Sequence, residues 1–234
     1  MLDKGQATHG ARRPKHPLTL LLAAVALIPL SGGLLTTAAA DTALLASADP
    51  SRVTPKLSKK CTKCHNEDGV SDDPETPHLA GQGASYLYKQ LQDFKADARD
   101  GGRMNKTAKK LSDQQMADLV TLYAAKPLPE QDGVSVPEAP ALVSAGDAGR
   151  GIDACGDCHG PDGRGKKDKY DAPALAGMPL AYFQLQMEAF RDGERTNDAD
   201  GVMGKAAKPL SDDEIASLAD YYRALGKREP IPES

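Results

Sequence analysis

The sequence predicts an all-α protein built from two tandem copies of one small domain. Its 234 residues repeat a set of short motifs at an offset of 94 to 99 positions; the plainest, Leu79-Ala80-Gly81, returns as Leu175-Ala176-Gly177. Apolar residues in both copies recur at helical spacing, and no run alternates between apolar and polar residues as a half-buried strand would. Repetition and helical periodicity together indicate the fold class.

Residues 1–40 have the layout of a secretory signal. Arg12, Arg13 and Lys15 form a basic region, residues 18–30 form an apolar run, and Ala38-Ala39-Ala40 offers a cleavage site of small residues. Ala46-Ser47-Ala48 is a second candidate for the cut, and an uncleaved anchor is the alternative to a cleaved signal. In either case we expect the rest of the chain to work outside the cytoplasm.

Each copy is expected to begin with a short helix that precedes its cysteine pair. The chain enters this helix at Thr54-Pro55 in the first copy, with proline at the first helical position, and at Asp147 in the second. A middle helix follows, from Tyr86 to Ala96 and from Tyr182 to Asp192. The aromatic residues at matching positions indicate that the two middle helices are equivalent.

The last helix of each copy opens with a capping box, in which a serine and a Gln or Glu three residues later satisfy each other's backbone groups. Ser112 pairs in this way with Gln115, and Ser211 with Glu214. The stretch 126–141 holds four prolines and is typical of a semi-extended linker. The predicted organisation is therefore a signal over 1–40, domains over 41–125 and 142–234, and a linker between them.

Composition excludes two other classes of protein. Hydrophobic residues make up 40% of the chain and charged residues 26%, the proportions of a globular protein rather than of a disordered one. The formal net charge is -4 without a long basic run, which argues against a nucleic-acid partner. Aromatic residues are scarce, with no Trp, so each domain can build only a thin core. Small domains of this kind usually need a covalent link or a cofactor for stability.

All four cysteines lie in two C-x-x-C-H motifs, one in each copy: Cys61, Cys64 and His65, and Cys155, Cys158 and His159. This motif is typical of covalent haem c attachment. Two thiols one helical turn apart can each add to a vinyl group of one porphyrin, and the adjacent histidine then lies beneath the iron as its proximal ligand. The repeated motif predicts two covalently bound haem c groups.

Three other uses of these cysteines fit less well. Two disulfides are compatible with an oxidising compartment, but they require no histidine after each pair. A zinc site needs ligands closer together than 94 residues. A thioredoxin-like site needs a βαβ setting, which the sequence lacks.

The second axial ligand of each iron is found by comparing the copies. His78 aligns with Ala174, so it cannot serve both, and its plain interpretation is a surface loop residue. Met104 and Met203 match, each seven residues before a Leu-Ser-Asp motif and each in a glycine-flanked loop. Methionine is a common partner of histidine on haem iron. We therefore expect His65 with Met104 at the first iron and His159 with Met203 at the second.

With these motifs the chain resembles the di-haem cytochromes c4, which are tandems of two class-I cytochrome c domains. The resemblance covers residues 54–227. It rests on both C-x-x-C-H motifs, on the Pro-x-Leu-Ala-Gly segments that begin at Pro77 and Pro173, on the middle helices and on the Leu-Ser-Asp motif after each methionine.

The resemblance implies a fold, a function and partners. It implies two domains related by a pseudo-twofold axis, with the haems near each other, and carbonyls of Pro77 and Pro173 that orient the proximal histidines. It implies a periplasmic electron carrier rather than an enzyme, possessing a donor such as a quinol-oxidising complex and an acceptor such as a terminal oxidase. Association with the membrane surface is a further expectation.

Two other functions are less favoured but remain open. The chain is also compatible with an electron-accepting cytochrome subunit of a periplasmic dehydrogenase, for example a flavoprotein sulfide dehydrogenase. A di-haem peroxidase requires an iron with an open axial position, and a methionine repeated in both copies argues against it.

Charge is distributed unevenly around the two predicted centres. Lysines cluster near both attachment motifs, at Lys59, Lys60 and Lys63 and at Lys166, Lys167 and Lys169. They form either a solvated face or a surface that steers acidic partners toward the haem edges. The local net charge is +4 over residues 99–110 and +1 over residues 195–208. On this basis we expect the first haem to have the higher potential.

Overall fold

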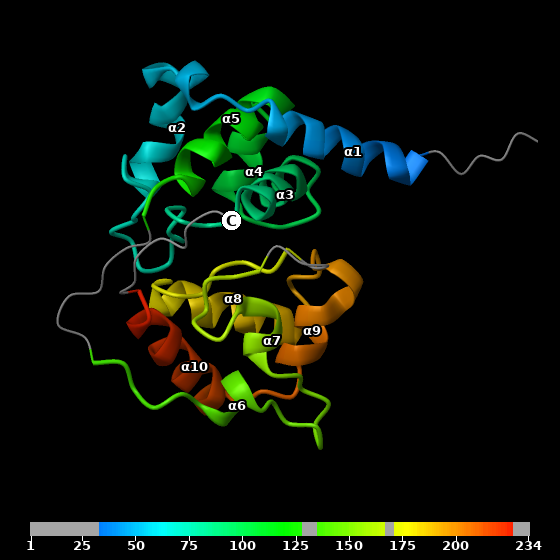
Figure 1. Ribbon diagram of the computed structural model, residues 1–234, viewed down its shortest axis with the longest axis vertical. Coiled ribbons are helices and arrows are strands. Elements are labelled where there is room, and N and C mark those ends of the chain that lie inside the picture. The colour runs from blue at the N-terminus through cyan, green and yellow to red at the C-terminus, as the bar shows by residue number, and fades with distance from the viewer. Residues whose placement is uncertain (1–32, 128–134, 167–170, 227–234) are drawn as a thin grey trace, which may run out of the picture.

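The structure, a computed structural model, describes residues 33–127, 135–166 and 171–226 (Figure 1). Over these ranges it is helical, with two isolated β-bridges and no strand. The helices form two clusters, α1 to α5 and α6 to α10, which face each other across a boundary in the middle of the molecule (Figure 1). The prediction of an all-α fold of two tandem domains is confirmed. The apolar run over 18–30, residues 128–134 of the predicted linker, and Lys167 and Lys169 lie outside the described residues.

The first cluster consists of four longer helices, one short helix and a 3-10 turn. Its elements are α1 (Gly33–Ala46), the 3-10 turn η1 (Pro50–Arg52), α2 (Pro55–His65), α3 (Ala84–Lys95), α4 (Arg103–Ala108) and α5 (Asp113–Ala124). Helix α3 packs against α4 and α5, and α1 lies along α5. Met116 and Tyr123 of α5 are buried in the centre of the core, together with Tyr88 of α3. Met116 is thus a core residue of the first domain.

The second cluster repeats this plan with a shorter start. Its elements are α6 (Ala141–Ser144), α7 (Cys155–His159), α8 (Leu180–Asp192), the 3-10 turn η2 (Ala199–Gly201), α9 (Val202–Ala207) and α10 (Asp212–Ala224). Helix α8 packs against α9 and α10, as α3 does against α4 and α5. Ile215, Leu218 and Tyr222 of α10 form the centre of the core, and Met187 of α8 is buried beside them.

Three of the predicted helix starts, at Pro55 and at the two capping boxes, are confirmed. Thr54 accepts a hydrogen bond from the amide of Leu57, with Pro55 at the first position of α2. Both capping boxes are formed, at the start of α5 and at the start of α10. Each of these starts uses a side-chain oxygen to satisfy an amide that the helix itself leaves without a partner.

The helix expected at Asp147 is not formed. Asp147 instead makes a bridge with Ile152 inside a turn, and its carboxylate accepts from the guanidinium of Arg150. Gly146 and Gly151 adopt positive φ angles of 65° and 70°, which side-chain-bearing residues rarely adopt. A segment this rich in glycine favours turns over a helix, so α7 begins only at Cys155.

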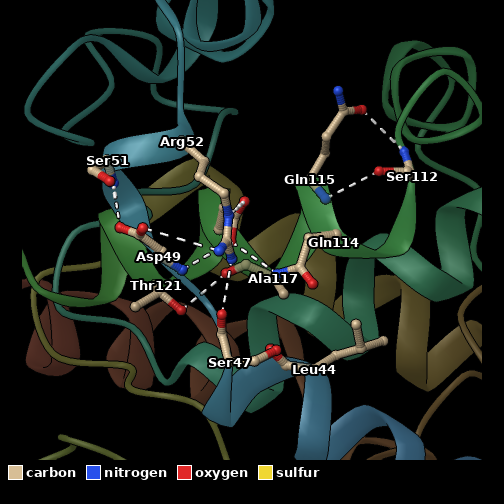
Figure 2. A network of polar contacts seen from close by, with 11 residues as sticks. Leu44, Ser47, Asp49, Ser51, Arg52, Ser112, Gln114, Gln115, Ala117 and Thr121 are labelled. Atoms are coloured by element: carbon tan, nitrogen blue, oxygen red, sulfur yellow. Dashed lines mark hydrogen bonds and ion pairs between the residues drawn. The ribbon is translucent and has the colours of Figure 1, made fainter.

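A buried carboxylate fastens the N-terminal segment to α5 (Figure 2). Asp118 accepts two hydrogen bonds from Arg52, at 2.9 and 2.6 Å, and one from the amide of Asp49 at 2.9 Å. These bonds lower the pKa of Asp118 to about 2. Leu44 and Leu45 of α1 pack on the same core. The segment around residue 50 is therefore held by charge and by apolar contact.

Within the described ranges, no helix combines the length and the apolar character that crossing a bilayer requires.

Candidate functional site

Both C-x-x-C-H motifs lie on helices. Cys61, Cys64 and His65 form the end of α2, and the five residues from Cys155 to His159 are α7 itself. This geometry places the two cysteines of each motif one turn apart, as thioether attachment to one porphyrin requires. The four cysteines, all within the described residues, form no disulfide.

The surroundings of the cysteines suit a neutral sulfur. Burial raises the pKa of the Cys61 thiol to about 11, and it also raises the pKa of Cys155. A thioether carries no proton and no charge, so a haem linkage satisfies this apolar setting, whereas a zinc thiolate would not. Among the described residues no three His, Cys, Asp or Glu side chains are grouped as ligands of a single metal ion.

The two histidines are buried and identically oriented. The Nδ1 of His65 lies 3.0 Å from the carbonyl oxygen of Pro77, and the Nδ1 of His159 lies 2.8 Å from that of Pro173. A carbonyl can only accept, so Nδ1 carries the proton and the lone pair resides on Nε2, the nitrogen that can bind iron. Burial lowers the pKa of His65, which keeps its ring neutral. Both rings are thus prepared as ligands.

One cavity of about 770 Å³ connects the two domains. Its wall includes His65 and Met104 from the first domain and His159 and Met203 from the second. All four residues predicted as iron ligands therefore line the same internal space. The attachment cysteines Cys61, Cys64 and Cys158 line it as well.

Met104 and Met203 lie in the first turns of α4 and α9, not in loops as expected. Short helices follow the glycines because each turn before them is fixed by a side chain. Asn105 accepts from the amide of Gly101 at 2.8 Å and donates to the carbonyl of Arg99 at 2.8 Å. Asp198 accepts from the amide of Met203 at 2.7 Å. The two methionines are thus held at equivalent places by different side chains.

His78 is not the surface residue that its loop position suggested. It is 6% exposed, lines the cavity, and accepts at Nδ1 from the amide of Ser71 at 3.0 Å. Its place next to Pro77, whose carbonyl holds His65, explains the burial. The Pro-x-Leu-Ala-Gly segment at Pro77 is visible in the sequence. The histidine within it occurs in only one of the two domains, so the repeat does not predict whether its side chain is buried.

A polar network joins the domains along a pseudo-twofold axis. Arg99 donates to Tyr182 and to Gln186 of α8, at 3.1 and 2.6 Å. Arg195 makes the reciprocal contacts with α3, to Tyr86 at 3.4 Å and to Gln90 at 3.3 Å. Arg99 recurs as Arg195 and Tyr86 as Tyr182, both at an offset of 96. That shared offset is the signal in the sequence from which this interface could have been predicted.

The two arginines of this network also bear on whether the cavity can hold haem. Arg99 is 8% exposed, and the groups that it and Arg195 contact, Gln90, Gln186 and two tyrosines, are neutral. Among the described residues, neither guanidinium forms an ion pair with a carboxylate. Burying a cation without an anion is costly. Haem c carries two propionate carboxylates, which would supply the anion that these two guanidinium groups lack among the described residues.

Comparisons with known proteins agree with this geometry. The cytochrome c family profile matches residues 55–122 and 147–226. Cytochrome c4 of Thiocapsa roseopersicina is 36% identical over 76% of this chain and 94% of its own. The thiosulfate dehydrogenase electron acceptor of Stutzerimonas stutzeri is 37% identical over 72% and 80%. The crystal structure of reduced recombinant cytochrome c4 from Pseudomonas stutzeri superposes with a TM-score of 0.64 at 34% identity, over 76% of this chain and 99% of its own.

Two helical domains, each with a C-x-x-C-H motif and a histidine held by a proline carbonyl, define a di-haem c-type cytochrome. The chain belongs to the cytochrome c4 family. Like the cytochromes c4, it is an electron carrier and not an enzyme. It carries two covalently attached haem c groups, and it exchanges electrons with redox partners.

Proposed function

We propose that this protein is a periplasmic carrier that passes single electrons between respiratory partners through two His/Met-ligated haems. His65 and Met104 bind the first iron, and His159 and Met203 bind the second. The observation that carries the proposal is the single cavity whose wall holds both histidines and both methionines.

The residues of the chain have distinct tasks in this proposal. Haem c supplies a one-electron ferric–ferrous couple. Cys61 and Cys64 anchor the first group and Cys155 and Cys158 the second, while Pro77 and Pro173 fix the tautomer and the ring plane of the two histidines. Thioether ligands favour ferrous iron and raise the potential. With a histidine and a methionine bound to each iron, neither iron would have a place for substrate or oxygen.

The domain boundaries belong to the same proposal. The signal covers residues 1–40, the first domain 41–125, the linker 126–141 and the second domain 142–234. Two observations support these limits: α5 ends at Ala124, and α6 begins at Ala141. The periplasmic location follows from the predicted signal and from thioether attachment of haem, which takes place outside the cytoplasm.

The partners are proposed from charge and resemblance. The donor is a quinol-oxidising complex and the acceptor a terminal oxidase. Lys59, Lys60 and Lys63 are exposed beside the first attachment motif, and Lys60 also lines the cavity, so positive charge at this place favours an acidic partner. Stopped-flow reduction of the purified protein by its donor should slow as ionic strength rises. A rate independent of salt would exclude this steering.

A second function has support from the relatives. The protein from Stutzerimonas stutzeri is named as an electron acceptor of thiosulfate dehydrogenase and matches over 80% of its length. An electron-accepting role beside a dehydrogenase is therefore the alternative. The deciding experiment is affinity purification of the tagged holoprotein under mild conditions. Stable co-purification of a dehydrogenase supports the alternative, whereas rapid reduction by the quinol-oxidising complex supports the free carrier.

A further inference from the structure

The side chain of Gln82 crosses the domain boundary and bonds to the backbone of Ala174. Its Nε2 donates to the carbonyl oxygen of Ala174 at 3.0 Å, and its Oε1 accepts from the amide of Ala174 at 2.7 Å. Gln82 is 3% exposed and lies in the wall of the cavity. A buried amide side chain of the first domain is thus bonded through both of its polar atoms to one residue of the second, and its Oε1 also accepts from the amide of Gly83 at 3.1 Å.

The amide of Ala174 and the carbonyl of Pro173 belong to one peptide unit. That carbonyl accepts from Nδ1 of His159 at 2.8 Å, so the unit connects Gln82 to His159. Hydrogen bonds that share a peptide unit polarise one another: an acceptor at the amide hydrogen makes the carbonyl oxygen a stronger acceptor. Gln82 therefore strengthens the bond that holds the ring of His159.

The first haem lacks this arrangement. At the position equivalent to Gln82 the second domain has Met178, and at the position equivalent to Ala174 the first domain has His78. A thioether cannot donate and is only a weak acceptor. The Nδ1 of His65 lies 3.0 Å from the oxygen of Pro77, against 2.8 Å for the equivalent pair in the second domain. The pseudo-twofold symmetry is therefore broken next to a proximal histidine.

We propose that Gln82 is a positioning residue for the second haem, supplied by the first domain. By strengthening the bond from His159 to Pro173, it gives the imidazole more anionic character and makes it a better donor to ferric iron. The potential of the second haem is thereby lowered, and that of the first is not. This inference rests on the proposed function in one respect, since it takes His159 as an iron ligand.

The test is a redox titration of the holoprotein carrying Gln82→Met, which installs the residue found at the equivalent position. The potential of the second haem should rise, while the potential of the first haem stays at its wild-type value. In the reduced state, the Nδ1 proton of His159 should move upfield in the NMR spectrum and exchange faster with solvent. Met178→Ala is the matched control, because it truncates the equivalent buried side chain without removing a hydrogen bond to either proline peptide.

The proposal can also be tested by NMR on the wild-type protein alone. In its reduced state, the Nδ1 proton of His159 should resonate further downfield and exchange more slowly than that of His65. The reverse order overturns the proposal, as does a Gln82→Met protein in which both potentials shift equally or neither shifts. The ring-current-shifted methyl signal of Met203 reports ligation separately. Its absence contradicts the proposed ligands, whereas its presence with an unmoved potential contradicts only the role of Gln82.

Discussion

Arg99 and Tyr182 join the two domains through a hydrogen bond of 3.1 Å between guanidinium and phenol. Arg195 and Tyr86 repeat this bond in the opposite direction. Each arginine also lies over the phenylalanine of its own domain, Arg99 at 4.8 Å and Arg195 at 4.3 Å from the ring centroid. Each guanidinium is held in place by contacts within its own domain as well as by the bonds across the boundary. The interface is therefore preorganised.

Replacing Arg99 with Ala should destabilise the docked pair of domains. Gln90, Gln186 and Tyr182 would each lose one donor, although Gln90 and Gln186 would still accept from Arg195. A hydrogen bond to a charged group contributes about 1.5–3 kcal/mol. Guanidinium denaturation of the holoprotein, followed by haem absorbance, should show a loss of roughly 2–4 kcal/mol, since the losses are not additive. Arg103→Ala, at an exposed position, is the control. Equal costs for the two variants would show that the network contributes nothing specific.

The ligand assignment predicts a spectroscopic loss. Met104→Ala and Met203→Ala should each abolish the weak far-red sulfur-to-iron charge-transfer band for one haem, which the family resemblance leads us to expect for ferric His/Met iron. Both haems should stay attached, because the thioethers come from the cysteines. The affected haem should have a lower potential, since water or hydroxide stabilises ferric iron better than a thioether does.

Two buried methionines are the controls for that experiment. Met116 and Met187 are 0% and 8% exposed and belong to the two cores. Their replacement by Ala should reduce the free energy of unfolding by ~2–5 kcal/mol and leave the band intact. Loss of half the band in Met187→Ala, with a full band in Met203→Ala, would show that the repeat alignment assigns the wrong ligand.

The sequence was sufficient for those features that repeat. The capping boxes at Ser112 and Ser211 and the two C-x-x-C-H motifs use local chemistry, so spacing alone predicts them. The sequence predicts a helix at Asp147 as the counterpart of α2, but Gly146 and Gly151 adopt positive φ angles there and form a turn instead. The bond between Gln82 and Ala174 joins residues 92 apart and occurs only once. No repeat marks such a contact, and only the docking of the two domains creates it.

Asp118 should make stability depend on pH under acidic conditions. Bonds from Arg52 lower its pKa to about 2, from a usual value of 3.8. The folded protein thus holds the charged form more strongly than the unfolded chain does. The resulting stabilisation is complete above about pH 4 and is lost as the pH falls toward 2. The side chain of Arg52 is 46% exposed, so solvent screens the ion pair. We therefore expect it to contribute on the order of 1 kcal/mol to the free energy of unfolding.

Comparison of wild type with Asp118→Asn checks this contribution. The variant keeps the shape of the side chain but loses the charge. Its free energy of unfolding should lie below that of wild type at pH 6, and the two should converge as the pH approaches 2. A difference that stays constant over this range would mean that packing, and not ionisation, determines the effect.

The structure favours one of the two candidate signal cleavage sites. A cut after Ala40 leaves Asp41, which accepts from Gln92 at 2.9 Å, and it also retains Leu44 and Leu45 on the core. A cut after Ala48 would remove all three. The mature protein should therefore begin at Asp41, as intact mass and N-terminal sequencing of the periplasmic protein would establish. A first residue of Asp49 would contradict this, and a full-length product would indicate an anchor.

The two haems should differ in potential, with the first the higher. The structure reduces the charge difference between residues 99–110 and residues 195–208. Lys109, which contributes to the net charge of +4 over 99–110, forms an ion pair at 2.6 Å with Asp97, which lies just before that range. The carboxylate of Asp198, which is already counted in the net charge of +1 over residues 195–208, accepts from the amide of Met203 and therefore lies close to the second centre, where it favours ferric iron. The bond from Gln82 to the peptide of Pro173 acts in the same direction.

These contributions respond differently to salt, and that makes the order of potentials testable. Screening acts over about 10 Å at 0.1 M ionic strength and weakens the influence of exposed lysines, but not that of a buried hydrogen bond. Redox titrations should therefore give two potentials whose separation narrows with added salt without vanishing. Met104→Ala and Met203→Ala identify the haem to which each potential belongs. A single potential shared by two equal sites would contradict the inequality, and a lower potential at the first haem would show that burial outweighs both charge and hydrogen bonding.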